Sequence, residues 1–344
     1  MRLQTVLQVV VALTFPLACP STPAWAWHEE GHKAAARAAV AALPADSLPE
    51  FFRAGAGAIA DGAPEPDLFT RPIGPPALHD AESPEHRFDI ELLEGNAPPA
   101  RRYDLIALCA ARKIDPRRVG FLPYAVCEWT QKLSVALAEH RKWPGNPLIR
   151  RKCLLYAGIL SHYSADLCQP LHTTIHYDGR AGADGNSPRS GIHMKVDALL
   201  GKLSADANAP FRDGPAAERA AAMEDLFAAV SAEVAASHAL VDKVYDLERR
   251  IPAYEAPLEA NSPAAAFAAE RLRACARFTA SLYLTAWKDS RSIRFPDWHK
   301  REEPVGKALD PDLARSETPA GAPAGAAPDH PQLREDRSTA LQSR

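Results

Sequence analysis

The sequence predicts an all-α protein, a single mainly helical domain that carries long functional loops. Apolar residues recur at the three- and four-residue spacing that places them on one face of a helix, and alanine and leucine dominate the composition. No stretch alternates convincingly with the two-residue period of a half-buried strand. With 344 residues and 47% hydrophobic content, the chain can bury one large core or two modest ones.

The first helix is predicted over residues 32–43, because Pro44 stops it. A second is predicted over residues 47–60, with Ser47 as its N-cap and Glu50 completing a capping box three residues later.

Residues 61–100 are rich in proline and glycine and are predicted to form a long loop. Loops of this length inside a domain are usually either functional or disordered. This one contains Asp67 and His86, so we expect a functional loop.

Two long helices are predicted over residues 119–143 and 148–168, with the break W-P-G-N-P between them. A glycine-rich loop over 173–190 follows. Further helical segments are predicted over 194–203, 216–249 and 264–287. Residues 301–344 have few large apolar side chains, so we expect a disordered tail after a domain that spans 27–300.

The first 26 residues have the layout of a secretory signal peptide. Arg2 precedes an apolar run over 6–18, and Ala24-Trp25-Ala26 forms a small-x-small cleavage site. The apolar run is too short to span a bilayer comfortably. Cleavage after Ala26 would send the protein to the periplasm or the medium and leave Trp27 with a free α-amine that can bind a metal.

A competing signal lies upstream, where Leu17-Ala18-Cys19 resembles a lipoprotein processing site. Pro16 stands where an aliphatic residue is expected, so this alternative ranks second. Lipidation at Cys19 would leave the nitrogen of Trp27 in a peptide bond.

Charge and cysteine content narrow the function further. The formal charge is -3 and no long basic stretch is present, which argues against non-specific binding to duplex nucleic acid. An exported chain can form disulfides, but an odd number of cysteines leaves at least one unpaired. The cysteines after residue 26 are Cys109, Cys127, Cys153, Cys168 and Cys275.

Histidines and aspartates at metal-ligand spacing run through the chain. His162 and Asp166 are four residues apart in a helical segment, which places both side chains on one face, and His193 and Asp197 repeat the spacing. One such pair could be a hydrogen-bonded surface pair, but two pairs with His172 just after Q-P-L favour a metal site. Histidine together with carboxylate suits zinc better than magnesium or calcium.

Two ligand assignments stay open. His176 lies four residues after His172, and Asp61 lies near Asp67. We prefer His172 and Asp67. The remaining histidines stand without ligand-spaced carboxylates or are expected to point to solvent, and are not predicted as ligands: His28, His79, His140, His238, His299 and His330.

Two motifs carry a family resemblance. W-x-x-x-G-H begins at Trp27, and H-x-x-x-D-x-x-Q-P-x-H runs from His162 to His172. With them the chain resembles the zinc-dependent phospholipase C and type I nuclease superfamily, over about residues 27–290. The nucleases of this group are single-strand-specific enzymes with three zinc ions. The resemblance implies a mainly α-helical single domain.

The resemblance also implies a ligand set. Trp27, through its amine and carbonyl, and His32 would bind one zinc, and Asp166 would bridge it to a second. The other ligands would be Asp67, His86 and His162 for the second zinc, and His172, His193 and Asp197 for the third. A hydroxide between the latter two zincs would attack phosphorus, with Asp67 and Asp166 as the catalytic carboxylates.

Departures from the family pattern separate its two branches. The short spacing from Trp27 to His32 favours the nucleases, whereas His162-Tyr163 and G-I-H-M-K-V-D are closer to the phospholipases. The nucleases usually have a G-G-N turn after Q-P-L-H, and here only A-D-G-N, ending at Asn186, is found.

The leading hypothesis is therefore a secreted, monomeric zinc nuclease that hydrolyses single-stranded DNA and RNA to 5′-phosphorylated products. Stacking of unpaired bases would need exposed aromatic rings. Phe88, Tyr163 and Tyr177 are candidates that could equally belong to the core. The alternatives are a zinc phospholipase C, which needs an apolar lipid-facing surface near its site, and a zinc-binding protein without enzymatic activity. No stable protein partner is expected.

Overall fold

The computed structural model describes residues 29–70, 75–203 and 219–301. These residues are mainly helical and contain no strand, only an isolated bridge between Tyr177 and Gly179. The prediction of an all-α domain is therefore confirmed. The predicted signal peptide, Trp27, His28, His330 and nearly all of the predicted tail lie outside the described residues.

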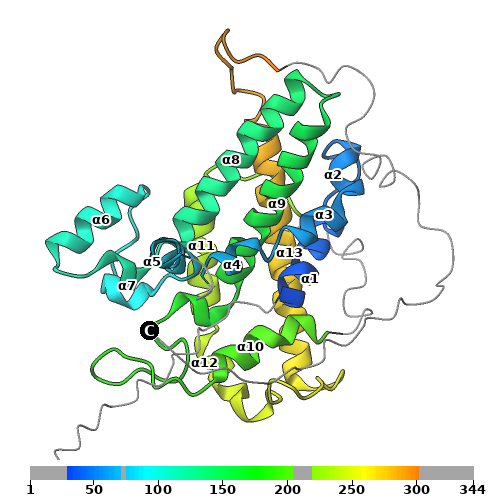
Figure 1. The fold of residues 1–344 in the computed structure, drawn as a ribbon. Coiled ribbons are helices and arrows are strands. Elements are labelled where there is room, and N and C mark those ends of the chain that lie inside the picture. The colour runs from blue at the N-terminus through cyan, green and yellow to red at the C-terminus, as the bar shows by residue number, and fades with distance from the viewer. Residues whose placement is uncertain (1–28, 71–74, 204–218, 302–344) are drawn as a thin grey trace, which may run out of the picture. The chain divides into compact units, whose positions relative to one another are not determined.

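Four helices build the centre of the fold: α1 (Glu29–Ala41), α8 (Leu122–Lys142), α9 (Pro147–Cys168) and α13 (Pro263–Asp289). Figure 1 shows α8 and α9 side by side as a long hairpin, with α13 running behind them. Helix α9 contacts each of the other three, and every residue from 157 to 168 is buried. A helix buried on all sides is part of a core, so its polar side chains must find partners inside the protein.

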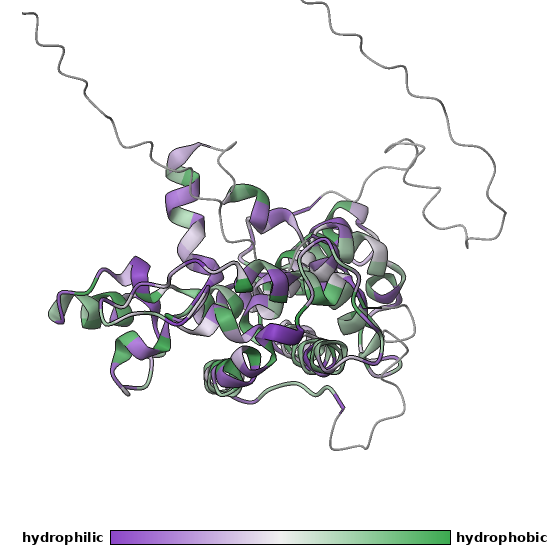
Figure 2. Ribbon diagram, turned by 90° about the horizontal axis from the view of Figure 1, so that it is seen from below, coloured by the Kyte–Doolittle hydropathy of each residue, from purple (hydrophilic) through white to green (hydrophobic). Residues whose placement is uncertain are grey.

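Shorter helices surround this centre. The α-helices are α2 (Glu50–Ala54), α3 (Ala56–Asp61), α4 (Glu65–Phe69), α5 (Pro76–Glu82), α6 (Arg102–Ala111), α7 (Pro116–Val119), α10 (Ile192–Gly201), α11 (Leu226–His238) and α12 (Val241–Leu247). The 3₁₀ helices are η1 (Ser83–His86), η2 (Ile90–Leu93), η3 (Pro170–Thr173) and η7 (Glu248–Arg250). In Figure 2, apolar and polar stretches alternate along single helices, as expected of helices that each present one face to a core.

The prediction of one helix over residues 47–60 is wrong in two respects. The segment is divided at Gly55 into α2 and α3, since glycine is unfavourable inside a helix. The side chain of Leu154 on α9 lies against this position, 2.5 Å from where a Cβ would stand. Ser47 is not the N-cap, since α2 begins after Pro49 and the Ser47 hydroxyl donates to the carbonyl of Pro44 at 2.7 Å.

The prediction of a long loop over residues 61–100 is also wrong, because that segment contains α4, α5, η1 and η2. Each is only one or two turns long, and α4, α5 and η1 have proline in the first turn, so periodicity could not reveal them. The helix predicted over 216–249 is divided into α11 and α12 in its described part, and α6 and most of α7 were missed.

The five cysteines among the described residues are free thiols, and all five are buried. These five therefore form no disulfide with one another in the structure. No helix among the described residues is long and apolar enough to cross a membrane.

The contact between α9 and α3 predicts a measurable cost at Gly158. A Cβ there would lie 2.6 Å from the carbonyl oxygen of Ile59, whereas one at Gly57 would meet nothing within 4 Å. Because both positions are helical, Gly158→Ala should lower the free energy of unfolding by about 1–3 kcal/mol through overpacking, while Gly57→Ala should raise it by up to about 1 kcal/mol. Urea denaturation of the two variants checks this, and equal stability of Gly158→Ala and the wild type would contradict it.

Candidate metal centre

The structure brings together every predicted ligand that lies among its described residues. They come from six elements: α1 contributes His32, α4 Asp67, η1 His86, α9 His162 and Asp166, η3 His172, and α10 His193 and Asp197. All are buried. They form three groups whose ligand atoms converge: His32, His162 and Asp166; Asp67, His86 and His162; His172, His193 and Asp197. Each of these groups could hold a metal ion.

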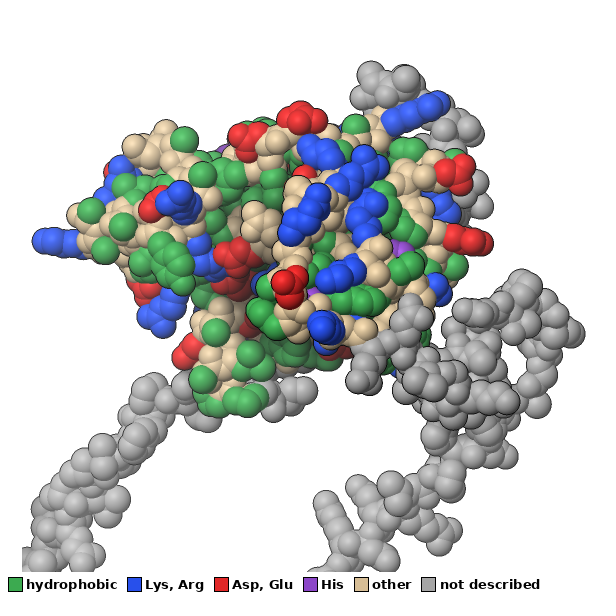
Figure 3. All heavy atoms as spheres, turned by 90° about the horizontal axis from the view of Figure 1, so that it is seen from above, with side chains coloured by type: hydrophobic (Ala, Val, Ile, Leu, Met, Phe, Trp, Pro, Cys, Tyr) green, Lys and Arg blue, Asp and Glu red, His purple; other side chains and the backbone are tan. Residues whose placement is uncertain are grey.

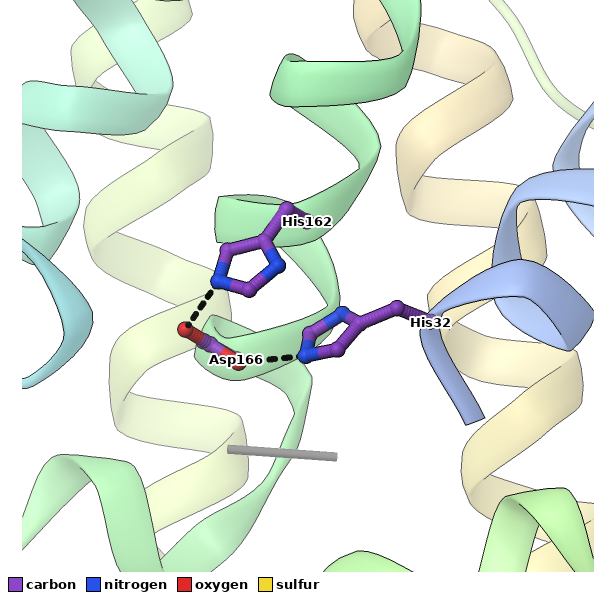
Figure 4. A group of neighbouring side chains, drawn as sticks. All are labelled: His32, His162 and Asp166. Atoms are coloured by element: carbon purple, nitrogen blue, oxygen red, sulfur yellow. Dashed lines mark ion pairs between the residues drawn. The ribbon is translucent and has the colours of Figure 1, made fainter. Parts of the chain in front are cut away.

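Asp166 lies where the first two groups meet, and its carboxylate is fully buried. Its Oδ1 is 3.5 Å from Nε2 of His32, and its Oδ2 is 3.0 Å from Nδ1 of His86 and 3.4 Å from Nε2 of His162. Figure 4 shows His162 and His32 directed at opposite oxygens of this carboxylate, from α9 and α1. A carboxylate with its two oxygens facing different histidines has the arrangement needed to bridge two metal ions.

The second group has dimensions that fit a tetrahedral ion. Oδ1 of Asp67 lies 3.9 Å from Nδ1 of His86 and 3.8 Å from Nε2 of His162. The two histidine nitrogens are 3.0 Å apart, and Oδ2 of Asp166 lies 3.0 Å from Nδ1 of His86 and 3.4 Å from Nε2 of His162. Ligands placed 2.0–2.1 Å from a tetrahedral zinc are roughly 3.3 Å from one another. The donors therefore stand close to the spacing that such an ion requires.

The third group is built on the predicted four-residue repeat of α10. Nε2 of His193 lies 3.1 Å from Oδ2 of Asp197, and Nε2 of His172 lies 3.8 Å from Oδ1. Gln169, at the end of α9, donates from its side-chain amide to Oδ1 of Asp197 at 2.7 Å. The Q-P-L-H turn therefore places a ligand and orients a second one at the same time.

Main-chain carbonyls orient three of the histidines. In each, Nδ1 lies at hydrogen-bonding distance from a carbonyl oxygen, which leaves Nε2 free to face the carboxylates. The pairs are His162 with Ala63 at 2.9 Å, His172 with His86 at 2.5 Å, and His193 with Tyr177 at 3.1 Å.

Several buried atoms of the centre make no hydrogen bond within the described part of the protein. They include both ring nitrogens of His32, Nε2 of His86, Oδ1 of Asp166 and Nε2 of His172. Buried polar atoms without partners are rare and destabilising. Metal ions would satisfy Nε2 of His32, Oδ1 of Asp166 and Nε2 of His172, which face other donors of the groups, so the residues present fit the group that the sequence implies.

The pKa values show how tightly the charges are coupled without a metal. Burial opposes the protonation of His86, but its hydrogen bond with Asp166 and the nearby Glu82 raise its pKa to about 10. Burial likewise opposes protonation of His172, yet Asp166 raises its pKa to about 9. Burial and the charge of His162 lower the pKa of His32 well below its usual range. Both rings are therefore protonated at neutral pH as long as no metal is bound. A metal ion that binds to them would have to displace these protons.

His86 is oriented differently from the other histidines, and Glu82 accounts for this. Its Nδ1 faces the second group, while the buried Nε2 points away from that group and lies 3.7 Å from Oε1 of Glu82. The same Glu82 oxygen accepts a hydrogen bond from the hydroxyl of buried Tyr163. Sequence reasoning missed Glu82, although its position four residues before His86 was a usable signal.

The structure separates the ligand alternatives. Asp61 is exposed at the end of α3, whereas Asp67 belongs to the second group. His176 accepts a hydrogen bond from the main-chain nitrogen of Ala181 at 2.9 Å and belongs to none of the groups. The described histidines that were not predicted as ligands also belong to none of the groups: His79, His140, His238 and His299.

The aromatic candidates for base stacking have different positions. Phe88 and Tyr163 are buried, with 0% and 2% exposure, so neither presents a free face to a base. Tyr177 is half-buried, and its ring centre is 6.0 Å from that of His193, edge to face. Of the three, only Tyr177 stays a candidate.

No protein-family model matches the chain, and no curated protein matches it. The functional assignment therefore depends on the residues of the chain itself and on the geometry of the three groups.

Replacing Glu82 should weaken metal binding at the second group. Glu82→Gln keeps the volume but removes the charge beside Nε2 of His86, and loss of a carboxylate that orients a ligating histidine typically lowers metal affinity about 10–100-fold. Asp80→Asn, at an exposed position of the same helix α5, is the control and should change nothing. Competition with a chromophoric chelator measures both. Wild-type affinity in Glu82→Gln would show that His86 needs no such partner.

Proposed function

We propose that this protein is a secreted zinc-dependent phosphodiesterase of the phospholipase C and type I nuclease superfamily, and that it hydrolyses single-stranded DNA and RNA to 5′-phosphorylated products. The observation that carries the proposal is the presence of three buried histidine–carboxylate groups close together, of which the first two meet at Asp166 and the third approaches it at 4.0 Å through Nδ1 of His172. A site for several adjacent ions suits phosphoryl chemistry, because ions can stabilise both the attacking and the leaving oxygen of an in-line displacement.

Zinc is the ion that the donors favour. Each group combines imidazole nitrogen with carboxylate oxygen, a mixture that suits zinc, whereas magnesium and calcium prefer oxygen alone. The first group shares His162 and Asp166 with its neighbour, and only His32 is its own. It therefore needs further ligands, and the amine and carbonyl of Trp27, five residues before His32, would supply them.

Different residues of the site would have different roles in catalysis. Asp166 would hold two ion positions at a fixed separation, since each of its oxygens faces a different group. Asp67 and His86 have 9% and 10% of their side chains exposed, so a phosphodiester would approach from their side of the centre. Bound zinc would lower the pKa of a water and stabilise negative charge on the phosphoryl oxygens.

One observation supports the alternative substrate, a phospholipid. Leu68 follows Asp67 on α4 and is 42% exposed, and Leu78 lies four residues before Glu82 on α5 and is 37% exposed. Exposed leucines on the helices that carry these carboxylates offer the apolar contact that a lipid-facing site needs.

The two substrates can be separated in one experiment. The zinc-loaded mature protein, beginning at Trp27, is incubated side by side with single-stranded DNA, single-stranded RNA and phosphatidylcholine vesicles. Release of 5′-phosphorylated nucleotides, abolished by a chelator, with the lipid intact supports the nuclease. Headgroup release with intact nucleic acid moves the protein to the phospholipase branch, and bound zinc without turnover of any substrate would contradict an enzymatic role.

Asp166→Asn should release at least one zinc ion and abolish hydrolysis. The neutral amide cannot replace a buried carboxylate that faces two groups at once. Asp61→Asn, at the exposed end of α3, is the control and should keep full zinc content. Zinc per chain, measured by atomic emission on folded protein, checks the prediction. A normal zinc count and normal activity in Asp166→Asn would reject the shared-carboxylate arrangement.

An extra residue before Trp27 should weaken the zinc of the first group. The α-amine would then be an amide nitrogen, which no longer offers a lone pair to the metal. Zinc affinity of the mature chain is compared with that of a chain carrying one additional N-terminal alanine. If both retain the ion equally against a chelator, the Trp27 amine is not a ligand.

A further inference from the structure

One end of the helical bundle carries a strongly basic surface. It is formed by residues 139–152, around the turn between α8 and α9, and by residues 289–301, which begin at the last residue of α13. We call it the basic end surface. These segments contain nine lysines and arginines and three carboxylates, a net charge of +6 in a chain whose formal charge is -3. Figure 3 looks down on this end, and lysine and arginine side chains gather there.

The two segments are held together by a buried carboxylate. Glu139 is 2% exposed and binds Nε2 of His299 at 2.8 Å and the guanidinium of Arg301 at 2.9 Å, together with the ammonium of Lys152. This neutralises one carboxylate inside the surface. Asp289 is half-buried and Asp297 is exposed. The exposed cations that remain are Arg141, Lys142, Arg151, Arg291, Arg294 and Lys300.

The cations of this surface lie close enough to one another to affect the pKa values of neighbouring groups, in addition to the larger effect of burial. Burial lowers the pKa of Arg141, and the charge of Arg291 lowers it further. Burial lowers the pKa of His140 to about 4, with Arg150 and Arg141 contributing. A surface whose cations disfavour one another attracts a polyanion, because the incoming negative charges relieve the repulsion.

Aromatic rings lie between these cations. Trp298 is 80% exposed. The ammonium of Lys142 is 4.7 Å from the ring centre of half-buried Trp143, which is 6.1 Å from that of Phe295. Cations that follow a phosphate backbone, combined with aromatic faces on which bases stack, are typical of proteins that bind single-stranded nucleic acid.

Helix α9 joins this surface to the metal centre. Lys152 lies near its first turns, and His162 and Asp166 follow ten and fourteen residues later. At 1.5 Å per residue these ligands are about 15 and 21 Å from Lys152 along the helix axis. Both sites therefore belong to one rigid element, at a separation that a strand of several nucleotides can span.

We propose that the basic end surface is a second binding site for single-stranded nucleic acid, which holds a part of the strand away from the metal centre. The inference rests on the proposed nuclease function for its role in turnover, but strand binding itself does not require hydrolysis. It predicts that long strands have a lower KM than dinucleotides, whereas kcat is the same.

The test removes exposed cations and the exposed ring without touching the metal centre. One variant combines Arg151→Gln, Arg291→Gln and Lys300→Gln, and a second is Trp298→Ala. The control combines three exposed cations outside the basic end surface: Arg37→Gln, Arg101→Gln and Lys113→Gln. Binding of the zinc-loaded protein to a nuclease-resistant phosphorothioate strand of about 30 nucleotides, longer than one binding module covers, is measured by fluorescence anisotropy at several salt concentrations.

The triple variant should bind the strand at least about tenfold more weakly, and its log–log salt slope should be shallower by about 2, since each lost phosphate contact removes about 0.7 on a single strand. Trp298→Ala should weaken binding with an unchanged salt slope. KM for the long strand should rise while KM for a dinucleotide, kcat and zinc content stay as in the control.

Equal strand binding by the triple variant and the control overturns the proposal. So does a result in which the triple variant loses binding only to anionic phosphatidylglycerol vesicles, since the surface would then be a lipid site. A protein that binds the strand through this surface but hydrolyses none would contradict the proposed nuclease function and leave the binding site standing.

Discussion

The whole arrangement depends on one buried carboxylate. Asp166 has no exposure to solvent, and histidines from α1, η1 and α9 itself surround its two oxygens. An isolated carboxylate at this depth would be strongly destabilising, and the partners that compensate it come from segments far apart in the chain. The metal centre therefore forms at the same time as α1 and the 83–86 turn pack onto α9. Metal binding should contribute directly to stability.

Charge is distributed unequally over the molecule. This distribution relates the basic end surface to the metal centre. The basic end surface holds a net +6, so the rest of the chain carries a formal -9. Part of that excess belongs to the carboxylates of the metal centre, which bound cations would offset. A metal-loaded protein would thus present positive charge at two places along α9, at its beginning and in its buried second half, which suits a long anionic substrate better than a small neutral one.

Sequence patterns could predict the parts of this structure that repeat locally. Two H-x-x-x-D pairs, each on one helix face, indicated ligands that do meet in the structure, and long periodic segments indicated α8, α9 and α13. Contacts between distant segments could not be predicted in this way. The close approach of Leu154 on α9 to Gly55, where the predicted helix is divided, is one such contact. The basic end surface escaped notice because neither of its segments is a long basic stretch, and Glu139 joins them across 160 residues.

The most direct test of this account is the zinc content of the mature chain beginning at Trp27, measured by mass spectrometry after exhaustive dialysis. Three histidine–carboxylate groups predict three ions per chain, with anomalous scattering from a crystal placing each ion at a group. A protein that folds, stays stable and retains no zinc would contradict the account, because the buried nitrogens and oxygens of the centre would then need another explanation.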